Sequence, residues 1–152
     1  MTDTDAKTKV SEAESAALEL ATLSDEERSE ALHDIADAID ANRETILAAN
    51  EKDVSEAEEM LAAGEYSQAL VDRLDLSDSK LDSIIEMVRS VAEQDDPLGK
   101  TLSARELDDG LELYKMSVPI GVIGTVFESR PDALVQIAAL SLKSGKIGRA
   151  HV

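Results

Sequence analysis

The hydrophobic period of the chain changes near Pro97, and this change constrains the possible folds most strongly. Before it, apolar residues recur at helical spacing, so we expect about four amphipathic helices. After it, residues 101–118 alternate between apolar and polar, which is typical of β-strands. Residues 119–127 (PIGVIGTVF) are then continuously apolar, which indicates a strand buried on both faces. The sequence therefore predicts an α/β chain whose helices come first.

Short signals mark where the helices begin and end. Ser24 is followed three residues later by Glu27, which is the pattern of a capping box at a helix start. Gly64 is expected to end a later helix, and Ser77 to begin another. The apolar stripe of that last helix consists of Leu81, Ile84, Ile85, Val88 and Val91.

Turn residues indicate the remaining elements. Asp109-Gly110 separates the two alternating runs and predicts a hairpin. The sequence ESRPDALVQIAALSLKSG predicts a helix with Pro131 in its first turn and Gly145 at its end. We therefore divide the chain into a helical part (1–99), a hairpin (100–118) and a strand–turn–helix unit (119–145).

The chain is strongly acidic, with 33 acidic and 15 basic residues and a net charge of −18. This charge disfavours nucleic acids and anionic membranes as partners, because like charges repel. The acidic residues could form a patch for a basic partner, or a solvated surface as in proteins from a salt-rich cytoplasm. We favour the solvated surface, because the acidic residues interleave with apolar ones.

The sequence lacks several kinds of signal. It has no signal-peptide pattern and no apolar run of membrane-spanning length, so we expect a cytoplasmic protein. The absence of Cys excludes a disulfide or a cysteine nucleophile within the chain.

His33 has no ligand partner at a suitable spacing, so we expect it to be a surface or half-buried residue and expect no metal site. We expect Met60, Met87 and Met116 to pack in the core.

The turn FESRPD, residues 127–132, is the segment best suited to bind a ligand. It joins the carboxyl end of the predicted strand to a helix start, where free backbone amides favour anions. Arg130 adds a planar guanidinium that suits a phosphate, a carboxylate or an oxyanion. Alternatively, Arg130 pairs with Glu128 or Asp132 and only fastens the turn. The residues alone leave both interpretations open.

Residues 118–145 (VPIGVIGTVFESRPDALVQIAALSLKSG) closely resemble a segment of the gamma-glutamyl phosphate reductase family, within the aldehyde dehydrogenase superfamily. Residues 46–58 and 70–100 also resemble the helical region of this family. The Glu-Ser-Arg-Pro element at 128–131 is specific, since related aldehyde dehydrogenases carry Pro-Trp-Asn there. The resemblance extends over residues 11–145.

This resemblance implies a fold and an activity. The fold would be aldehyde-dehydrogenase-like, with a helical N-terminal part and the first strand–turn–helix of an incomplete Rossmann-type cofactor domain. The family reduces L-glutamate 5-phosphate with NADPH to L-glutamate 5-semialdehyde and phosphate, in proline biosynthesis, through a thioester on a cysteine. A homo-oligomer is also implied, with the hairpin in its oligomerisation part, and glutamate 5-kinase is a further expected partner.

The match to the family's motif also implies residue roles. Arg130 falls where the relatives carry an Asn that steadies the oxyanion, so it would steady the acyl phosphate or the thioester oxyanion. Val126, Phe127, Glu128 and Ser129 would lie along the nicotinamide end of NADPH. The catalytic Cys would lie outside this chain, so we expect the chain alone to be inactive.

The last seven residues, 146–152 (KIGRAHV), depart from the family's pattern, in which an Asn and a strand follow Ser-Gly. They match the in-frame translation of a common sequencing adapter together with its stop codon. We therefore expect these residues to be a library artefact in a longer natural protein. The strand at 119–127 would then have no neighbouring strand.

Two other functions are alternatives to the reductase. One is a non-catalytic acidic helical interaction module, which would unfold cooperatively as a monomer. The other is a different acylating aldehyde dehydrogenase, against which the Glu-Ser-Arg-Pro element argues.

Overall fold

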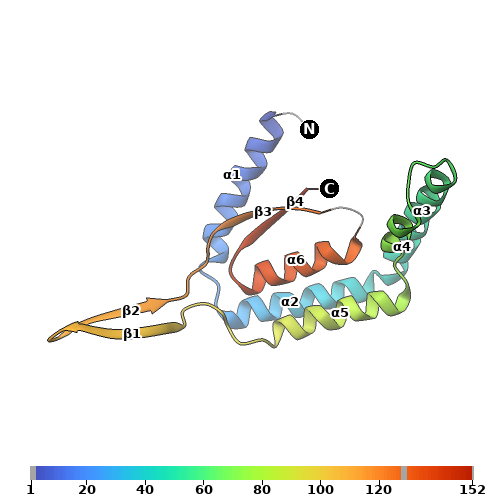
Figure 1. Ribbon diagram of the computed structural model, residues 1–152. Coiled ribbons are helices and arrows are strands. Elements are labelled where there is room, and N and C mark those ends of the chain that lie inside the picture. Colours follow the sequence, from blue (N-terminus) through green and yellow to red (C-terminus); the bar gives the residue numbers. More distant parts are fainter. Residues whose placement is uncertain (1–2, 128–129, 152) are drawn as a thin grey trace.

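The computed structural model describes residues 3–127 and 130–151 (Figure 1). Its helices are α1 (Asp3–Leu20), α2 (Asp25–Ala41), α3 (Arg43–Ala62), α4 (Gln68–Leu74), α5 (Asp78–Ala92) and α6 (Pro131–Lys143). Its strands are β1 (Thr101–Asp108), β2 (Leu111–Met116), β3 (Val122–Val126) and β4 (Ile147–His151). The predicted order of helices, hairpin, strand and helix is confirmed.

Helices α2, α5 and α6 form the body of the structure. Figure 1 shows α2 and α5 side by side, with α6 lying along them and the β3–β4 pair on the other side of α6. Helix α1 contacts β3 and β4, while α3 and α4 contact each other at one end of the body. Figure 1 shows the start of α6 near the end of the body that carries α4.

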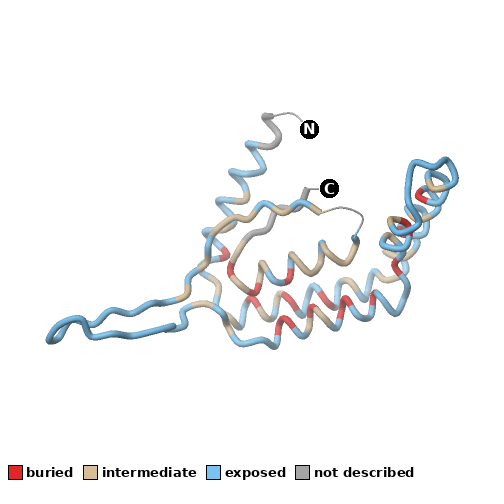
Figure 2. The backbone as a smooth tube through the Cα atoms, in the orientation of Figure 1, coloured by how far each residue is buried: buried red, intermediate tan, exposed pale blue. Residues whose placement is uncertain are grey.

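The hydrophobic core lies between these three helices. Figure 2 shows the buried positions following the facing sides of α2 and α5, with fewer on α6. Leu32 of α2 and Val88 of α5 are fully buried. All five residues of the predicted stripe on α5 are buried, as expected: Leu81, Ile84, Ile85, Val88 and Val91. Each such side chain contributes at most about 1.5–3 kcal/mol, because the unfolded chain already buries part of its apolar surface.

The predicted helix ends are also present. The Ser24 hydroxyl accepts a hydrogen bond from the Glu27 amide at 3.2 Å, and the Glu27 carboxylate accepts one from the Ser24 amide at 2.7 Å. This capping box confirms the prediction for α2. Ser77 caps α5 by accepting from the Lys80 amide. Gly64 follows α3 with a φ of 80°, a left-handed conformation that glycine adopts without steric cost.

A buried ammonium attaches the end of α6 to the other two helices. Lys143 Nζ donates hydrogen bonds to Ser29 Oγ at 2.9 Å and to the Ala92 carbonyl at 3.0 Å. It also lies 2.8 Å from Asp25 Oδ1, as an ion pair without hydrogen-bond geometry. Because a buried charge needs such partners, the position of α6 on α2 and α5 is strongly specified.

The hairpin of β1 and β2 extends away from the body (Figure 1). The strands pair antiparallel, with Asp108 opposite Leu111 next to the predicted Asp109-Gly110 turn. Every residue of both strands is exposed. The hairpin therefore buries nothing against the described part of this chain.

The pairing of β3 corrects one expectation. β4 pairs with β3 in parallel, with Val122 opposite Ile147 and Val126 opposite His151. The expectation that β3 has no neighbouring strand is therefore wrong. Gly145, with a φ of 60°, turns the chain back after α6. Strand pairing uses backbone groups, so any extended segment brought alongside β3 can satisfy them. The expected origin of residues 146–152 stays a prediction.

Two expectations for side-chain burial are also corrected. Met60 is 39% exposed and Met116 is 52% exposed, so neither packs in the core. Met60 lies on α3, which contacts mainly the short helix α4, and Met116 lies on the exposed hairpin. Met87 does pack against the core cluster, as expected. His33 is exposed, which agrees with its expected surface position.

Candidate functional site

Arg130 is the residue that precedes α6, at the carboxyl end of β3. Its backbone is extended, with φ −141° and ψ 92°, and its carbonyl accepts a hydrogen bond from the Ala133 amide at 3.1 Å. Pro131 occupies the first position of α6, where a missing amide hydrogen costs nothing. The sequence therefore begins the helix directly after Arg130 and leaves its side chain at the helix start.

The Arg130 side chain pairs with Asp132. Arg130 Nη2 donates to Asp132 Oδ2 at 2.9 Å, and Gln136 Nε2 donates to the same carboxylate at 3.4 Å. Hydrogen bonding to Arg130 lowers the pKa of Asp132, and the same bond raises the pKa of Arg130. Of the two partners that the sequence offered for Arg130, the structure therefore shows the ion pair with Asp132. The Arg130 side chain is still 55% exposed, so a ligand can reach it.

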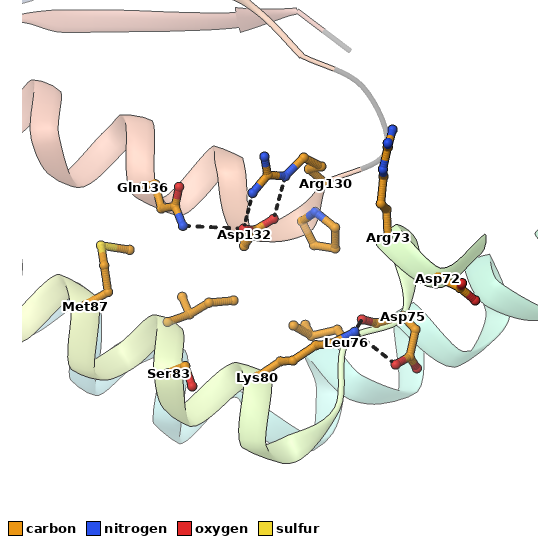
Figure 3. A pocket seen from close by; sticks show the side chains of 12 residues that line it. Asp72, Arg73, Asp75, Leu76, Lys80, Ser83, Met87, Arg130, Asp132 and Gln136 are labelled. Atoms are coloured by element: carbon orange, nitrogen blue, oxygen red, sulfur yellow. Dashed lines mark hydrogen bonds and ion pairs between the residues drawn. The ribbon is translucent and has the colours of Figure 1, made fainter. Parts of the chain in front are cut away.

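A cavity of about 670 Å³ lies beside this turn (Figure 3). One wall comes from α4, the start of α5 and the segment between them, and the other from the start of α6. The charged residues that line it are Asp72, Arg73, Asp75, Lys80, Arg130 and Asp132. Its volume falls in the range of small-molecule sites.

The three basic residues of the cavity differ in how they are paired. Lys80 Nζ donates to the Asp75 carbonyl at 2.5 Å and to its carboxylate at 3.2 Å. Arg130 is paired with Asp132. Arg73 makes no hydrogen bond or ion pair with any residue that the structure describes. Figure 3 shows Arg73 extending from α4 toward the start of α6.

The residues expected to contact a nicotinamide cofactor follow β3. Val126 is 85% exposed at the end of that strand, and Phe127 is half-buried. Both therefore offer apolar surface to a planar ring. Glu128 and Ser129 lie outside the described residues. A Cβ at Gly124 would meet none of the described atoms within 4 Å, so the strand is open for close approach of a ligand at this position.

Two kinds of site are not found in the part of the chain that the structure describes. No group of three or more His, Cys, Asp or Glu side chains is arranged to hold a metal ion. Among the same residues, no helix is long and apolar enough to cross a bilayer.

Comparison with known proteins identifies the family of this chain. A gamma-glutamyl phosphate reductase from Natronomonas pharaonis is 77% identical over 145 residues, which are 95% of this chain and 33% of that protein. The chain belongs to the gamma-glutamyl phosphate reductase family. It spans about one third of the length of the curated relatives that it matches. No protein-family model matches the chain.

Crystal structures of gamma-glutamyl phosphate reductases have the same fold. The enzyme from Saccharomyces cerevisiae is 42% identical, with a TM-score of 0.84 over 91% of this chain and 35% of that one. The enzyme from Thermotoga maritima is 34% identical, with a TM-score of 0.86 over 94% of this chain and 34% of that one. The predicted family and the predicted α/β class are therefore both confirmed.

No sequence pattern marks Arg73 or Lys80 as a site residue. Both lie in the segment 70–100, which resembles the helical region of the reductase family. Nothing local distinguishes Arg73 from other arginines on exposed helix faces. Only the packing of α4 and α5 near the start of α6 brings these residues to the same cavity as Arg130.

Proposed function

We propose that a protein of the family's full length that contains this chain reduces L-glutamate 5-phosphate. The products are L-glutamate 5-semialdehyde and phosphate, the reductant is NADPH, and the reaction serves proline biosynthesis in the cytoplasm. The observation that carries this proposal is the 77% identity to a gamma-glutamyl phosphate reductase over nearly the whole chain. Family membership disfavours both a non-catalytic acidic module and a different acylating aldehyde dehydrogenase.

The nucleophile in this reaction is a cysteine thiolate. The 152 residues contain no Cys, so the nucleophile belongs to another part of the full-length protein. The thiolate attacks the acyl phosphate, the C–O bond to phosphate breaks, and phosphate leaves. We expect the chain alone to have no reductase activity, because it lacks this group.

Arg130 stabilises the anion at the reacting end of the substrate. Its guanidinium is exposed and already oriented by Asp132, and its remaining N–H donors suit a phosphate or an oxyanion. The ion pair thus has a positioning role, and it does not prevent Arg130 from binding a ligand.

NADPH supplies the hydride that converts the thioester to the aldehyde. We propose that Val126 and Phe127 pack along its nicotinamide end, and that Glu128 and Ser129 provide polar groups there. The exposure of Val126 and the open space at Gly124 support this role. Val126 lies at the carboxyl end of a parallel strand, where ligands of open α/β sheets bind.

The exposed hairpin supports a homo-oligomer. Its exposed large apolar residues are Leu102, Leu107, Leu111, Leu113, Tyr114 and Met116. An apolar, exposed ribbon of this size is typical of an interaction surface. We propose that it pairs with another copy of the full-length protein. Glutamate 5-kinase is the second candidate partner, because it produces the substrate.

The test is an assay of the full-length protein in both directions. With L-glutamate 5-phosphate, the protein should oxidise NADPH. With L-glutamate 5-semialdehyde and phosphate, it should reduce NADP⁺, and omission of phosphate should abolish the reaction. An active protein that does not require phosphate would contradict the proposed function.

A further inference from the structure

Two guanidinium groups reach the same cavity from opposite walls. Arg130 stands at the start of α6, and Arg73 stands in the last turn of α4. Figure 3 shows Arg73 directed toward the start of α6. A cavity with separate guanidinium groups on two walls suits a short ligand that carries an anion at each end.

With respect to the residues that the structure describes, Arg73 is the basic residue of this cavity with the fewest hydrogen-bond partners. Lys80 is held by Asp75, and Arg130 by Asp132. Arg73 has no hydrogen-bond or ion-pair partner among residues 3–127 and 130–151. Its guanidinium presents a planar fork, which binds a carboxylate through two parallel hydrogen bonds.

The proposed substrate has two anionic ends, namely the acyl phosphate and the α-carboxylate. Arg130 lies at the carboxyl end of β3, next to the residues assigned to the nicotinamide, so the phosphate end belongs there. The α-carboxylate then has to lie away from the reacting atoms. The opposite wall, formed by α4 and the start of α5, offers Arg73 for it.

We propose that Arg73 binds the α-carboxylate of the substrate and thereby determines its specificity for an amino-acid semialdehyde. This inference rests on the proposed reductase function. It assigns to α4 the recognition of the non-reacting end of the substrate, and leaves the phosphate end to Arg130.

The reverse reaction of the full-length protein tests this assignment, because phosphate and semialdehyde are then separate substrates. Arg73→Ala should raise KM for L-glutamate 5-semialdehyde about 10- to 100-fold, the effect of losing hydrogen bonds to a charged group. KM for phosphate and for NADP⁺ should stay unchanged. Arg73→Lys, which keeps the charge but loses the fork, should give an intermediate value.

A second substrate separates recognition of the carboxylate from general damage. 4-Aminobutanal has the same chain without the carboxylate. The wild-type protein should prefer the amino-acid semialdehyde in kcat/KM, and Arg73→Ala should lose most of that preference. Arg89→Gln is the matched control, since Arg89 pairs with Asp37 outside the cavity and should change neither value.

The outcomes are distinct. An active wild-type protein with an unchanged preference in Arg73→Ala would overturn this inference alone. A rise in KM for phosphate instead of the semialdehyde would also overturn it, because Arg73 would then serve the phosphate end. A folded wild-type protein with no activity would overturn the proposed function, and this inference with it.

Discussion

The ammonium of Lys143, at the end of α6, lies 2.8 Å from Asp25 Oδ1, in the first turn of α2. The Lys143 side chain is only 4% exposed, and its hydrogen bonds to Ser29 and to the Ala92 carbonyl join three helices. A neighbouring ion pair, Arg28 with Asp96 at 2.8 Å, is also largely buried on the arginine side. The Lys143 contacts specify how α6 sits on α2 and α5, and the Arg28–Asp96 pair joins α2 to the segment after α5.

The first prediction concerns this ammonium. Lys143→Met removes one of two cations near Asp25, because Arg28 Nη2 also lies 3.6 Å from Asp25 Oδ1. It also removes one of two donors to the Ala92 carbonyl, to which the Ser29 hydroxyl donates as well. We expect a loss of about 1–3 kcal/mol in the free energy of unfolding, because hydrogen bonds of a buried charged group are lost while other partners remain. Thermal or urea unfolding followed by circular dichroism measures it. Lys52→Met, an exposed lysine on α3, is the control and should change stability little.

The second prediction concerns the start of α2. Ser24→Ala removes the acceptor for the Glu27 amide and should cost about 1 kcal/mol. Ser24→Asp restores an acceptor and should recover most of that stability. If Ser24→Ala and wild type unfold at the same urea concentration, the capping box does not contribute to stability.

The third prediction concerns pH. Hydrogen bonding to Arg130 holds the pKa of Asp132 below its usual value, so ionised Asp132 stabilises the turn. This contribution is fully present above the pKa that Asp132 has in the unfolded chain. It is lost as the pH falls through the lower pKa that Asp132 has in the folded chain. Arg130→Gln should therefore raise the pKa of Asp132, as measured by carbon NMR of its carboxyl group. An unchanged pKa would mean that the ion pair does not persist in solution.

The fourth prediction compares two glycines. Gly145 and Gly64 both have a positive φ, of 60° and 80°. A Cβ at Gly145 would lie 2.7 Å from Leu98 Cδ1 and 3.3 Å from Pro119 Cγ, whereas one at Gly64 would meet nothing within 4 Å. Gly64→Ala should thus cost about 1 kcal/mol from backbone conformation alone. Gly145→Ala should cost more, because Leu98 must also move. Equal unfolding midpoints for the two variants would contradict this packing.

Several features could be predicted from sequence because they depend on residues close together in the chain. The capping box of Ser24 and Glu27, the stripe on α5 and the Asp109-Gly110 hairpin each use local signals. The predicted turn at Arg130 is local in the same way. Arg130 pairs with Asp132, which is only two residues away and is one of the two partners that the sequence itself offers.

Other features could not be predicted because they depend on how distant segments pack. Arg73 joins Arg130 at one cavity only through the placement of α4 beside the start of α6. Lys143 is a basic residue in the last turn of α6, and its sequence neighbours do not indicate that its partners are on α2 and α5. β4 pairs with β3 because the chain reverses direction after Gly145, and the pattern of apolar and polar side chains does not predict this reversal.

The separation in sequence between Lys143 and its partners has a consequence for synthesis on the ribosome. Arg28 and Asp96 can meet as soon as α5 has emerged, so the α2–α5 pair can form early. The contacts of Lys143 with Ser29 and Asp25 form only after the end of α6 has been translated. During that interval the nascent chain exposes the apolar faces of α2 and α5 that α6 later covers. Contacts of such long range slow folding, and this interval is when a chaperone would most readily bind.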